Sequence, residues 1–220
     1  MRRLDPIVLC IKRIPPDESA LDKVIGVLEA GGVIAYPTET VYGLGCDAHR
    51  EGAVKRIVDL KGRDTGKPML VLVSSIEDAY GMVESVGAPA DALMHTFWPG
   101  PLTLVFKAKG DFPAALTDRR GCIGIRLSSD PVCRVLLERF RKPLVSTSAN
   151  PPGGEPAQDV SRVTAYFNGR VDLIVDDGQR TGTAPSTVLD VSDPVPVLIR
   201  PGPVGLEALR NVAGEVRSYG

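Results

Sequence analysis

The chain has 220 residues, of which 43% are hydrophobic and 24% are charged, and its formal net charge is -1. This composition is typical of a folded globular protein and argues against intrinsic disorder. The net charge gives no overall positive potential for binding nucleic acid. Four scattered cysteines without a CxxC pair and only two histidines argue against a structural zinc site and are typical of reduced thiols.

The chain begins with a short apolar run at residues 7–11, which Lys12 and Arg13 interrupt. This run is too short for a signal peptide or a membrane span, so we expect a cytoplasmic protein that does not associate with a membrane.

Apolar residues at helical spacing predict helices around residues 21–28, 53–60, 76–83, 90–97, 132–136, 161–167 and 206–216. Short apolar runs predict strands at residues 33–36, 69–73, 102–106, 122–127, 143–147, 171–175, 186–191 and 195–200. This mixture indicates an α/β domain with a large, partly parallel sheet. The Pro/Gly-rich stretch 151–156 is interpreted as a surface loop, because strand patterns continue beyond it.

A polar segment at residues 36–45 (YPTETVYGLG) follows the first predicted central strand. In open α/β sheets, ligands bind beyond the carboxyl ends of strands, so this segment is a candidate site. The alternative is a tight turn in which Pro and Gly only end the flanking elements and have no role in a site.

Cations follow the next helix as Lys61-Gly62-Arg63, with Lys67 shortly after. Such residues can complement the dipole at the carboxyl end of a helix. They can equally converge on phosphate oxygens, because Lys and Arg side chains on either side of a Gly have the reach to do so.

Other candidates lie at or within later strands. Small hydroxyl side chains in 146–150 (STSAN) can bind phosphate or ribose, or can cap the turn before the prolines that follow. Arg126 lies within an apolar strand, so it needs either an internal carboxylate or a ligand anion as its partner. Arg200 is a similar cation at a strand end. No Walker-type loop or GxGxxG turn is present, so the residues alone predict a cation-rich, hydroxyl-rich anion site.

Seven segments, in this order, resemble the YrdC-like family of threonylcarbamoyl-AMP synthases: GGVIAYPTETVYGLGCDA, KGR, FWPGPLTLVF, IGIRLSSDP, STSAN, APSTVLDV and LIRPGPV. The paired family signature, KxR followed by SxN, is intact, whereas a sister branch without a settled activity lacks part of it. The resemblance implies a single-domain, twisted, open mixed sheet flanked by helices, with a deep basic groove. It also implies three segments: an N-terminal extension packed on the domain (1–16), a catalytic domain (17–205) and a C-terminal helical tail (206–220).

The resemblance assigns the site residues. The residues expected on the threonine side are Thr38, Arg126, Ser146 and Ser186. Those expected on the ATP side are Lys61, Arg63, Cys122, Ser148 and Arg200. The expected catalytic set is Lys61, Arg63, Ser148 and Asn150, in which Asn150 orients the phosphates. Two departures stand out, because many relatives have Thr where this chain has Cys122, and many have a histidine in the strand that here reads Leu70-Val71-Leu72-Val73.

The implied activity uses ATP, L-threonine and bicarbonate or CO₂, with Mg²⁺ carried by the ATP phosphates and no metal site in the protein itself. The expected partner is a downstream tRNA threonylcarbamoyltransferase complex, and direct contact with tRNA is left open. Three alternatives also remain open. They are a carbamoyl-AMP-forming module with another acceptor, an RNA-binding protein without synthase activity, and the sister branch.

Overall fold

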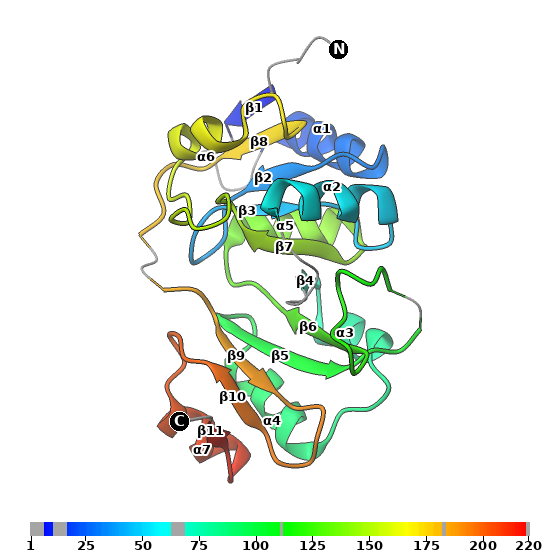
Figure 1. Cartoon of the computed structure of the whole chain (residues 1–220), viewed down its shortest axis with the longest axis vertical. Coiled ribbons are helices and arrows are strands. Elements are labelled where there is room, and N and C mark those ends of the chain that lie inside the picture. Colours follow the sequence, from blue (N-terminus) through cyan, green and yellow to red (C-terminus); the bar gives the residue numbers. More distant parts are fainter. Residues whose placement is uncertain (1–6, 11–16, 63–68, 111, 182–183, 219–220) are drawn as a thin grey trace.

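The computed structural model describes residues 7–10, 17–62, 69–110, 112–181 and 184–218. Its strands form one 11-stranded mixed sheet in the order β1-β8-β2-β3-β7-β4-β6-β5-β9-β10-β11. The sheet extends through the whole length of the molecule (Figure 1). Neighbouring strands are both parallel, as in β4–β6 and β5–β9, and antiparallel, as in β7–β4 and β5–β6, so the predicted mixed α/β class is confirmed.

The strands are β1 (Ile7–Cys10), β2 (Ile34–Tyr36), β3 (Gly43–Gly45), β4 (Leu70–Leu72), β5 (Leu102–Lys107), β6 (Cys122–Arg126), β7 (Leu144–Ser148), β8 (Leu173–Asp176), β9 (Thr187–Asp190), β10 (Val197–Arg200) and β11 (Arg217–Ser218). The helices are α1 (Glu18–Glu29), α2 (Glu51–Lys61), α3 (Ile76–Met82), α4 (Ala88–Phe97), α5 (Pro131–Phe140), α6 (Val160–Phe167) and α7 (Leu206–Ala213).

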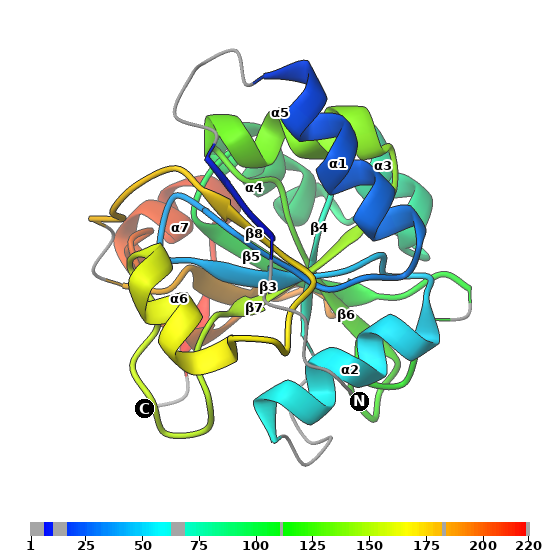
Figure 2. The ribbon, with the colours of Figure 1, turned by 90° about the horizontal axis from the view of Figure 1, so that it is seen from above.

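Helices cover both faces of the sheet. Helices α1 and α5 lie on one face and α2 and α6 on the other (Figure 2). Local sequence sets where they begin and end: Asp17 and Asp130 accept hydrogen bonds from backbone N–H groups at the starts of α1 and α5. Helix α2 is capped by Gly62, whose φ of 55° is the left-handed conformation that glycine adopts at little cost.

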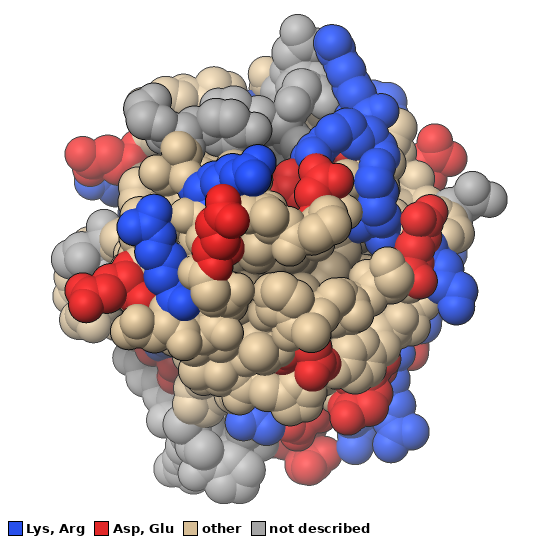
Figure 3. Space-filling model, turned by 90° about the horizontal axis from the view of Figure 1, so that it is seen from below, with Lys and Arg blue, Asp and Glu red and all other residues tan. Residues whose placement is uncertain are grey.

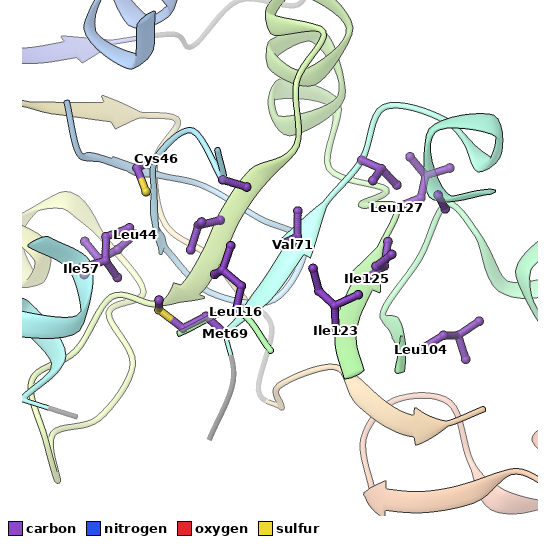
Figure 4. Close-up of a cluster of buried hydrophobic side chains, with 14 of the residues drawn as sticks. Leu44, Cys46, Ile57, Met69, Val71, Leu104, Leu116, Ile123, Ile125 and Leu127 are labelled. Carbon is purple, nitrogen blue, oxygen red and sulfur yellow. The ribbon is translucent and has the colours of Figure 1, made fainter. Parts of the chain in front are cut away.

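Strand β6 divides its residues between a packed face and an opposite face. Ile123 and Ile125 are fully buried in the main hydrophobic cluster together with Val71 of β4 and Leu104 of β5 (Figure 4). Burying each such side chain contributes about 1.5–3 kcal/mol. Because successive side chains of a strand point to opposite faces, the packing of Ile125 directs Arg126 to the other face of the sheet.

The structure adds to or differs from the sequence-based expectations at three places. The segment 36–45 is not only a turn, because Gly43–Gly45 forms the central strand β3 between β2 and β7. A Cβ on Gly45 would lie 2.6 Å from Cε1 of Tyr36 and 2.9 Å from the carbonyl oxygen of Val145, so this pairing requires glycine. The run 7–11 contains the edge strand β1, and the last helix ends at Ala213, before β11.

The terminal segments join the same sheet. Strand β1 pairs with β8, and β11 pairs with β10 in parallel. The proposed boundaries at residues 16 and 205 stay predictions, since most of residues 1–16 lies outside the described residues. Within the described part of the chain, no helix combines the length and apolar character needed to cross a bilayer.

Candidate functional site

A cavity of about 190 Å³ lies over the central strands, from β3 through β7, β4, β6, β5 and β9 to β10. Seven of its lining side chains carry hydroxyl groups on Thr or Ser: Thr38, Thr40, Thr103, Ser146, Thr147, Ser148 and Ser186. Two guanidinium groups, of Arg126 and Arg200, also line it. The cavity therefore combines many hydroxyls with two cations.

The site lies across the face of the sheet and is not confined to the region beyond the strand ends, where the sequence places it. Gly43 and Gly124 line the cavity, and neither has a side chain to fill it. A Cβ on Gly43 would lie 3.4 Å from Oγ of Ser146, and one on Gly124 would lie 3.4 Å from Cγ2 of Thr103. Missing side chains at these two strand positions thus leave room for a ligand on the sheet itself.

Arg126 has an internal carboxylate nearby and also lines the cavity. Its Nε lies 3.6 Å from Oε1 of Glu39, and the two side chains are 4% and 14% exposed. Neither of these two atoms makes a hydrogen bond, and the guanidinium of Arg126 donates none to any other described residue. Oγ of Ser128 donates to the second oxygen of Glu39. The sequence leaves a carboxylate and a ligand anion open as partners of Arg126. The structure has room for both, because Glu39 lies beside Nε and the guanidinium still lines the cavity.

Arg200 is anchored beside Ser186. Its Nε and Nη2 donate to the carbonyl oxygen of Ser186 at 3.1 and 2.8 Å, and Nη2 also reaches Oγ of Ser186 at 3.2 Å. That hydroxyl lies 2.9 Å from Oγ1 of Thr103. Partial burial and, to a smaller extent, the positive charge of Arg126 lower the pKa of Arg200. The two guanidiniums are thus close enough to affect each other.

The hydroxyls differ in how far they are already engaged. Oγ1 of Thr38 donates to the carbonyl oxygen of Val41 at 2.7 Å and closes the turn that carries the segment into β3. Ser146 is buried in the cavity wall beside the phenol of Tyr36, whose pKa burial raises well above its usual value. Oγ1 of Thr38 also accepts from the backbone N–H groups of Thr40 and Val41, both at 3.3 Å, so this hydroxyl is engaged both as a donor and as an acceptor.

Lys61 holds the SxN segment together. Its Nζ donates to the carbonyl oxygens of Ser148 and Asn150, both at 2.7 Å, and to Oδ1 of Asn150 at 2.9 Å. The residue is 6% exposed, so Lys61 is buried and is not a solvated side chain at the end of α2. The side-chain amide of Asn150 in turn donates to the carbonyl oxygens of Pro151 and Gly154. Lys61 and Asn150 together fix the loop that follows β7.

The predicted site residues fall into three groups. The cavity is lined by Thr38, Arg126, Ser146, Ser148, Ser186 and Arg200. Lys61 and Asn150 lie behind it, bonded to the segment that carries Ser148. Arg63 and Lys67 lie outside the described residues, so the predicted phosphate contact of Arg63 stays a prediction.

Cys122 lies two residues before Gly124 on the same face of β6, but it is fully buried and does not line the cavity. Its Sγ lies 4.0 Å from the carbonyl oxygen of Arg120, and burial raises the pKa of the thiol. Leu70 does line the cavity, at the strand where many relatives have a histidine. A nucleotide contact by Cys122 stays a prediction.

Sequence reasoning missed Thr103, Tyr42 and Glu39. Thr103 is a polar residue in an otherwise apolar strand, a signal that could have identified it. Tyr42 lines the cavity and donates to the carbonyl oxygen of Gly178 at 2.8 Å, and burial raises its pKa to about 12. Glu39 lies within the noted segment, but its contact with Arg126 depends on the fold.

Comparisons with known proteins point to one family. The family model Sua5_yciO_yrdC, described as "Telomere recombination", matches residues 26–202. The threonylcarbamoyl-AMP synthase of Pyrococcus abyssi is 35% identical over 194 residues, which are 88% of this chain and 57% of the relative. The threonylcarbamoyl-AMP synthase of Marinobacter nauticus is 39% identical over 165 residues, covering 74% of this chain and 86% of the relative.

A solved structure is also similar. The crystal structure of P. abyssi Sua5 complexed with L-threonine superposes with a TM-score of 0.92 at 33% identity. The match covers 97% of this chain and 62% of that one. This chain therefore spans somewhat more than half the length of the P. abyssi proteins it matches, and most of the length of the M. nauticus relative.

Proposed function

The chain belongs to the Sua5/YciO/YrdC family, and on that premise we propose that it is a threonylcarbamoyl-AMP synthase. It joins L-threonine, bicarbonate or CO₂, and ATP into threonylcarbamoyl-AMP and releases pyrophosphate. Two similar proteins carry this name, and a solved relative binds L-threonine. As a nucleotidyltransferase it supplies the threonylcarbamoyl group that is transferred to the adenosine next to the anticodon in tRNA.

The observation that carries this proposal is the pairing of two guanidiniums with a set of hydroxyls in one cavity. Arg126 is suited to the α-carboxylate of threonine, because a planar guanidinium can bind a carboxylate through two parallel hydrogen bonds. Ser146, Ser186 and Thr38 surround the remaining polar groups of the amino acid. A site that pairs the threonine hydroxyl would reject analogues that lack it.

The nucleotide end of the cavity is assigned to Arg200 and Ser148, with Arg63 expected to join them. Lys61 supports this end through the SxN segment, because its three hydrogen bonds fix the backbone that carries Ser148. Among the described residues, no three acidic, cysteine or histidine side chains come together as a metal site. We propose that Mg²⁺ enters bound to the phosphates of ATP, as part of the substrate.

The reaction needs no protein nucleophile. The amine of threonine adds to CO₂ and loses a proton, which gives a carbamate. A carbamate oxygen then attacks the α-phosphorus of ATP, and the bond to the bridging oxygen breaks so that pyrophosphate leaves. Holding the reactants in line and neutralising the phosphates are the two contributions that the cavity has to make.

The product would pass to a tRNA threonylcarbamoyltransferase complex, and we propose cytoplasm as the compartment. On the face shown in Figure 3, basic and acidic side chains are interspersed. A broad electrostatic footprint for RNA is therefore not visible on that face. Direct binding of tRNA would appear as a salt-dependent affinity in the absence of ATP.

Pyrophosphate release, measured while each substrate is omitted in turn, tests the proposal. We expect release only with ATP, threonine and bicarbonate together. Equal release with serine, or without any amino acid, would overturn the threonine assignment and favour a carbamoyl-AMP-forming module with another acceptor. Salt-dependent RNA binding with no turnover at all would favour the binding protein.

A further inference from the structure

The two guanidiniums of the cavity differ in their counter-charge. Arg126 has the carboxylate of Glu39 at 3.6 Å, and both side chains are largely buried. Arg200 is held by the backbone and hydroxyl oxygens of Ser186, and no acidic side chain of the described residues forms an ion pair with it. One end of the cavity is thus close to neutral, and the other carries a net positive charge.

The Glu39–Arg126 contact acts through charge and not through a hydrogen bond. Oε1 of Glu39 and Nε of Arg126 are both buried without a hydrogen-bond partner, as is the hydroxyl of the adjacent Tyr36. Ser128 fixes the other carboxylate oxygen of Glu39. Glu39 itself does not line the cavity, so it can affect a ligand only through the field at Arg126.

We propose that Glu39 is a specificity-determining residue, which keeps the amino-acid end of the cavity neutral so that this end prefers a zwitterion to a phosphate oxyanion. This inference rests on the proposed function, in which an amino acid and a triphosphate occupy one cavity. An isolated guanidinium attracts both a carboxylate and a phosphate group. With Glu39 beside it, Arg126 can still form hydrogen bonds, but its long-range attraction for multiply charged anions is largely cancelled.

A net-neutral ligand responds differently from an anion. For a zwitterionic amino acid, Glu39 repels the carboxylate and attracts the ammonium, so the two contributions oppose each other. Inorganic phosphate experiences only the repulsion, which is strong at short range in a partly desolvated site. Removing the Glu39 charge should therefore strengthen phosphate binding, whereas simple damage to the site would weaken the binding of every ligand.

The experiment uses Glu39→Gln, which keeps the shape of the side chain and an acceptor for Ser128 but removes the charge. Calorimetric titration with inorganic phosphate, with and without saturating threonine, measures binding at the threonine end. For the phosphate that threonine displaces, we expect the Kd to fall at least about tenfold relative to wild type. The threonine Kd should change by less than about threefold, because its two electrostatic contributions oppose each other.

Asp47→Asn is the matched control. Asp47 is also a buried carboxylate, its Oδ2 lies 3.5 Å from Nζ of Lys142, and it does not line the cavity. Its substitution should leave the phosphate Kd unchanged. The double variant Glu39→Gln/Arg126→Gln removes both charges. Its phosphate binding should be as weak as in wild type, or weaker.

Unchanged or weaker phosphate binding in Glu39→Gln would overturn the inference, as would phosphate binding that threonine does not compete away. If Glu39→Gln does not fold, the double variant decides, because phosphate binding tighter than in wild type there would also overturn it. Failure of the proposed function is recognised separately, since it appears in the wild-type protein as pyrophosphate release without threonine. The calorimetric comparison needs no turnover.

Discussion

The Lys61 region and the Arg126 region both bury a cation, yet they use it differently. Lys61 donates three hydrogen bonds to the SxN segment, and these bonds tie α2 to the end of β7. The guanidinium of Arg126 donates none to the other described residues and faces the cavity. Because buried polar groups are nearly always hydrogen-bonded, donors left over on a buried cation indicate a ligand, whereas engaged donors indicate a supporting role.

Removing Lys61 should have the largest effect and should act on stability as well as on activity. Lys61→Ala removes three charge-assisted hydrogen bonds to the SxN segment, although Oδ1 of Asn150 still accepts from Oγ of Ser148, and the cost is about 3 kcal/mol or more. We expect a lower melting temperature and a kcat/KM reduced at least about tenfold.

Lys55→Ala on the same helix is the control, because Lys55 pairs with Asp59 alone among the described residues and its side chain is 72% exposed. It should change stability by less than about 0.5 kcal/mol. A normal melting temperature in Lys61→Ala, with only ATP affinity lost, would mean that Lys61 acts chiefly as a phosphate ligand, and the comparison of the two regions would fail.

Arg126→Ala should weaken threonine binding by about 2–3 kcal/mol, the scale of a lost charge-assisted contact, and leave ATP binding nearly unchanged. The melting temperature should also fall, because Glu39 loses its only cation among the described residues. Arg126→Lys separates the two roles, since it keeps the charge beside Glu39 but loses the planar fork. Calorimetry beside a thermal melt measures both, and intact threonine affinity in either variant would rule out the ligand role.

Ser186→Ala should have a smaller effect. The carbonyl oxygen of Ser186 would still hold Arg200, so the variant loses only the hydroxyl, with its contact to Thr103 and its longer contact to Arg200. A neutral hydrogen bond contributes about 1 kcal/mol, so the KM for threonine should rise roughly fivefold. Steady-state kinetics with each substrate varied provides the check. A larger rise in the KM for ATP would place Ser186 at the nucleotide end.

Cys122→Thr should have the smallest effect. Cys122 is fully buried and lies outside the cavity lining, so we expect the KM for ATP to stay within about twofold of wild type. The threonine hydroxyl that this variant introduces can donate to the carbonyl oxygen that Sγ now approaches. A clear gain in ATP affinity would show that the hydroxyl of many relatives touches the nucleotide and that this chain has lost that contact.

The sequence predicted the fold where local pattern and burial agree. Apolar spacing around 53–60 predicted α2, and the run 122–127 predicted β6, in which the alternation of a strand puts Ile125 and Arg126 on opposite faces. It failed at β3, because Gly-Leu-Gly has the composition of a turn and becomes a strand only through pairing with β2 and β7.

The site was predicted where the motif residue itself faces the cavity, as with Ser146 and Arg200. The supporting role of Lys61 was not predictable, because its acceptors lie 87 and 89 residues away in the sequence and two of them are backbone oxygens. Glu39 was missed for the same reason. Its importance comes from a distance to Arg126 that only the folded chain defines.

Detection of the adenylate itself tests the central claim most directly. Wild-type protein is supplied with ATP, isotope-labelled bicarbonate and isotope-labelled threonine. The products are separated, and their masses are measured by mass spectrometry. We predict one adenylate that carries both labels, formed together with pyrophosphate. An adenylate that carries the bicarbonate label but not the threonine label, or AMP and pyrophosphate formed without either label, would contradict the claim that threonine and ATP react in this cavity.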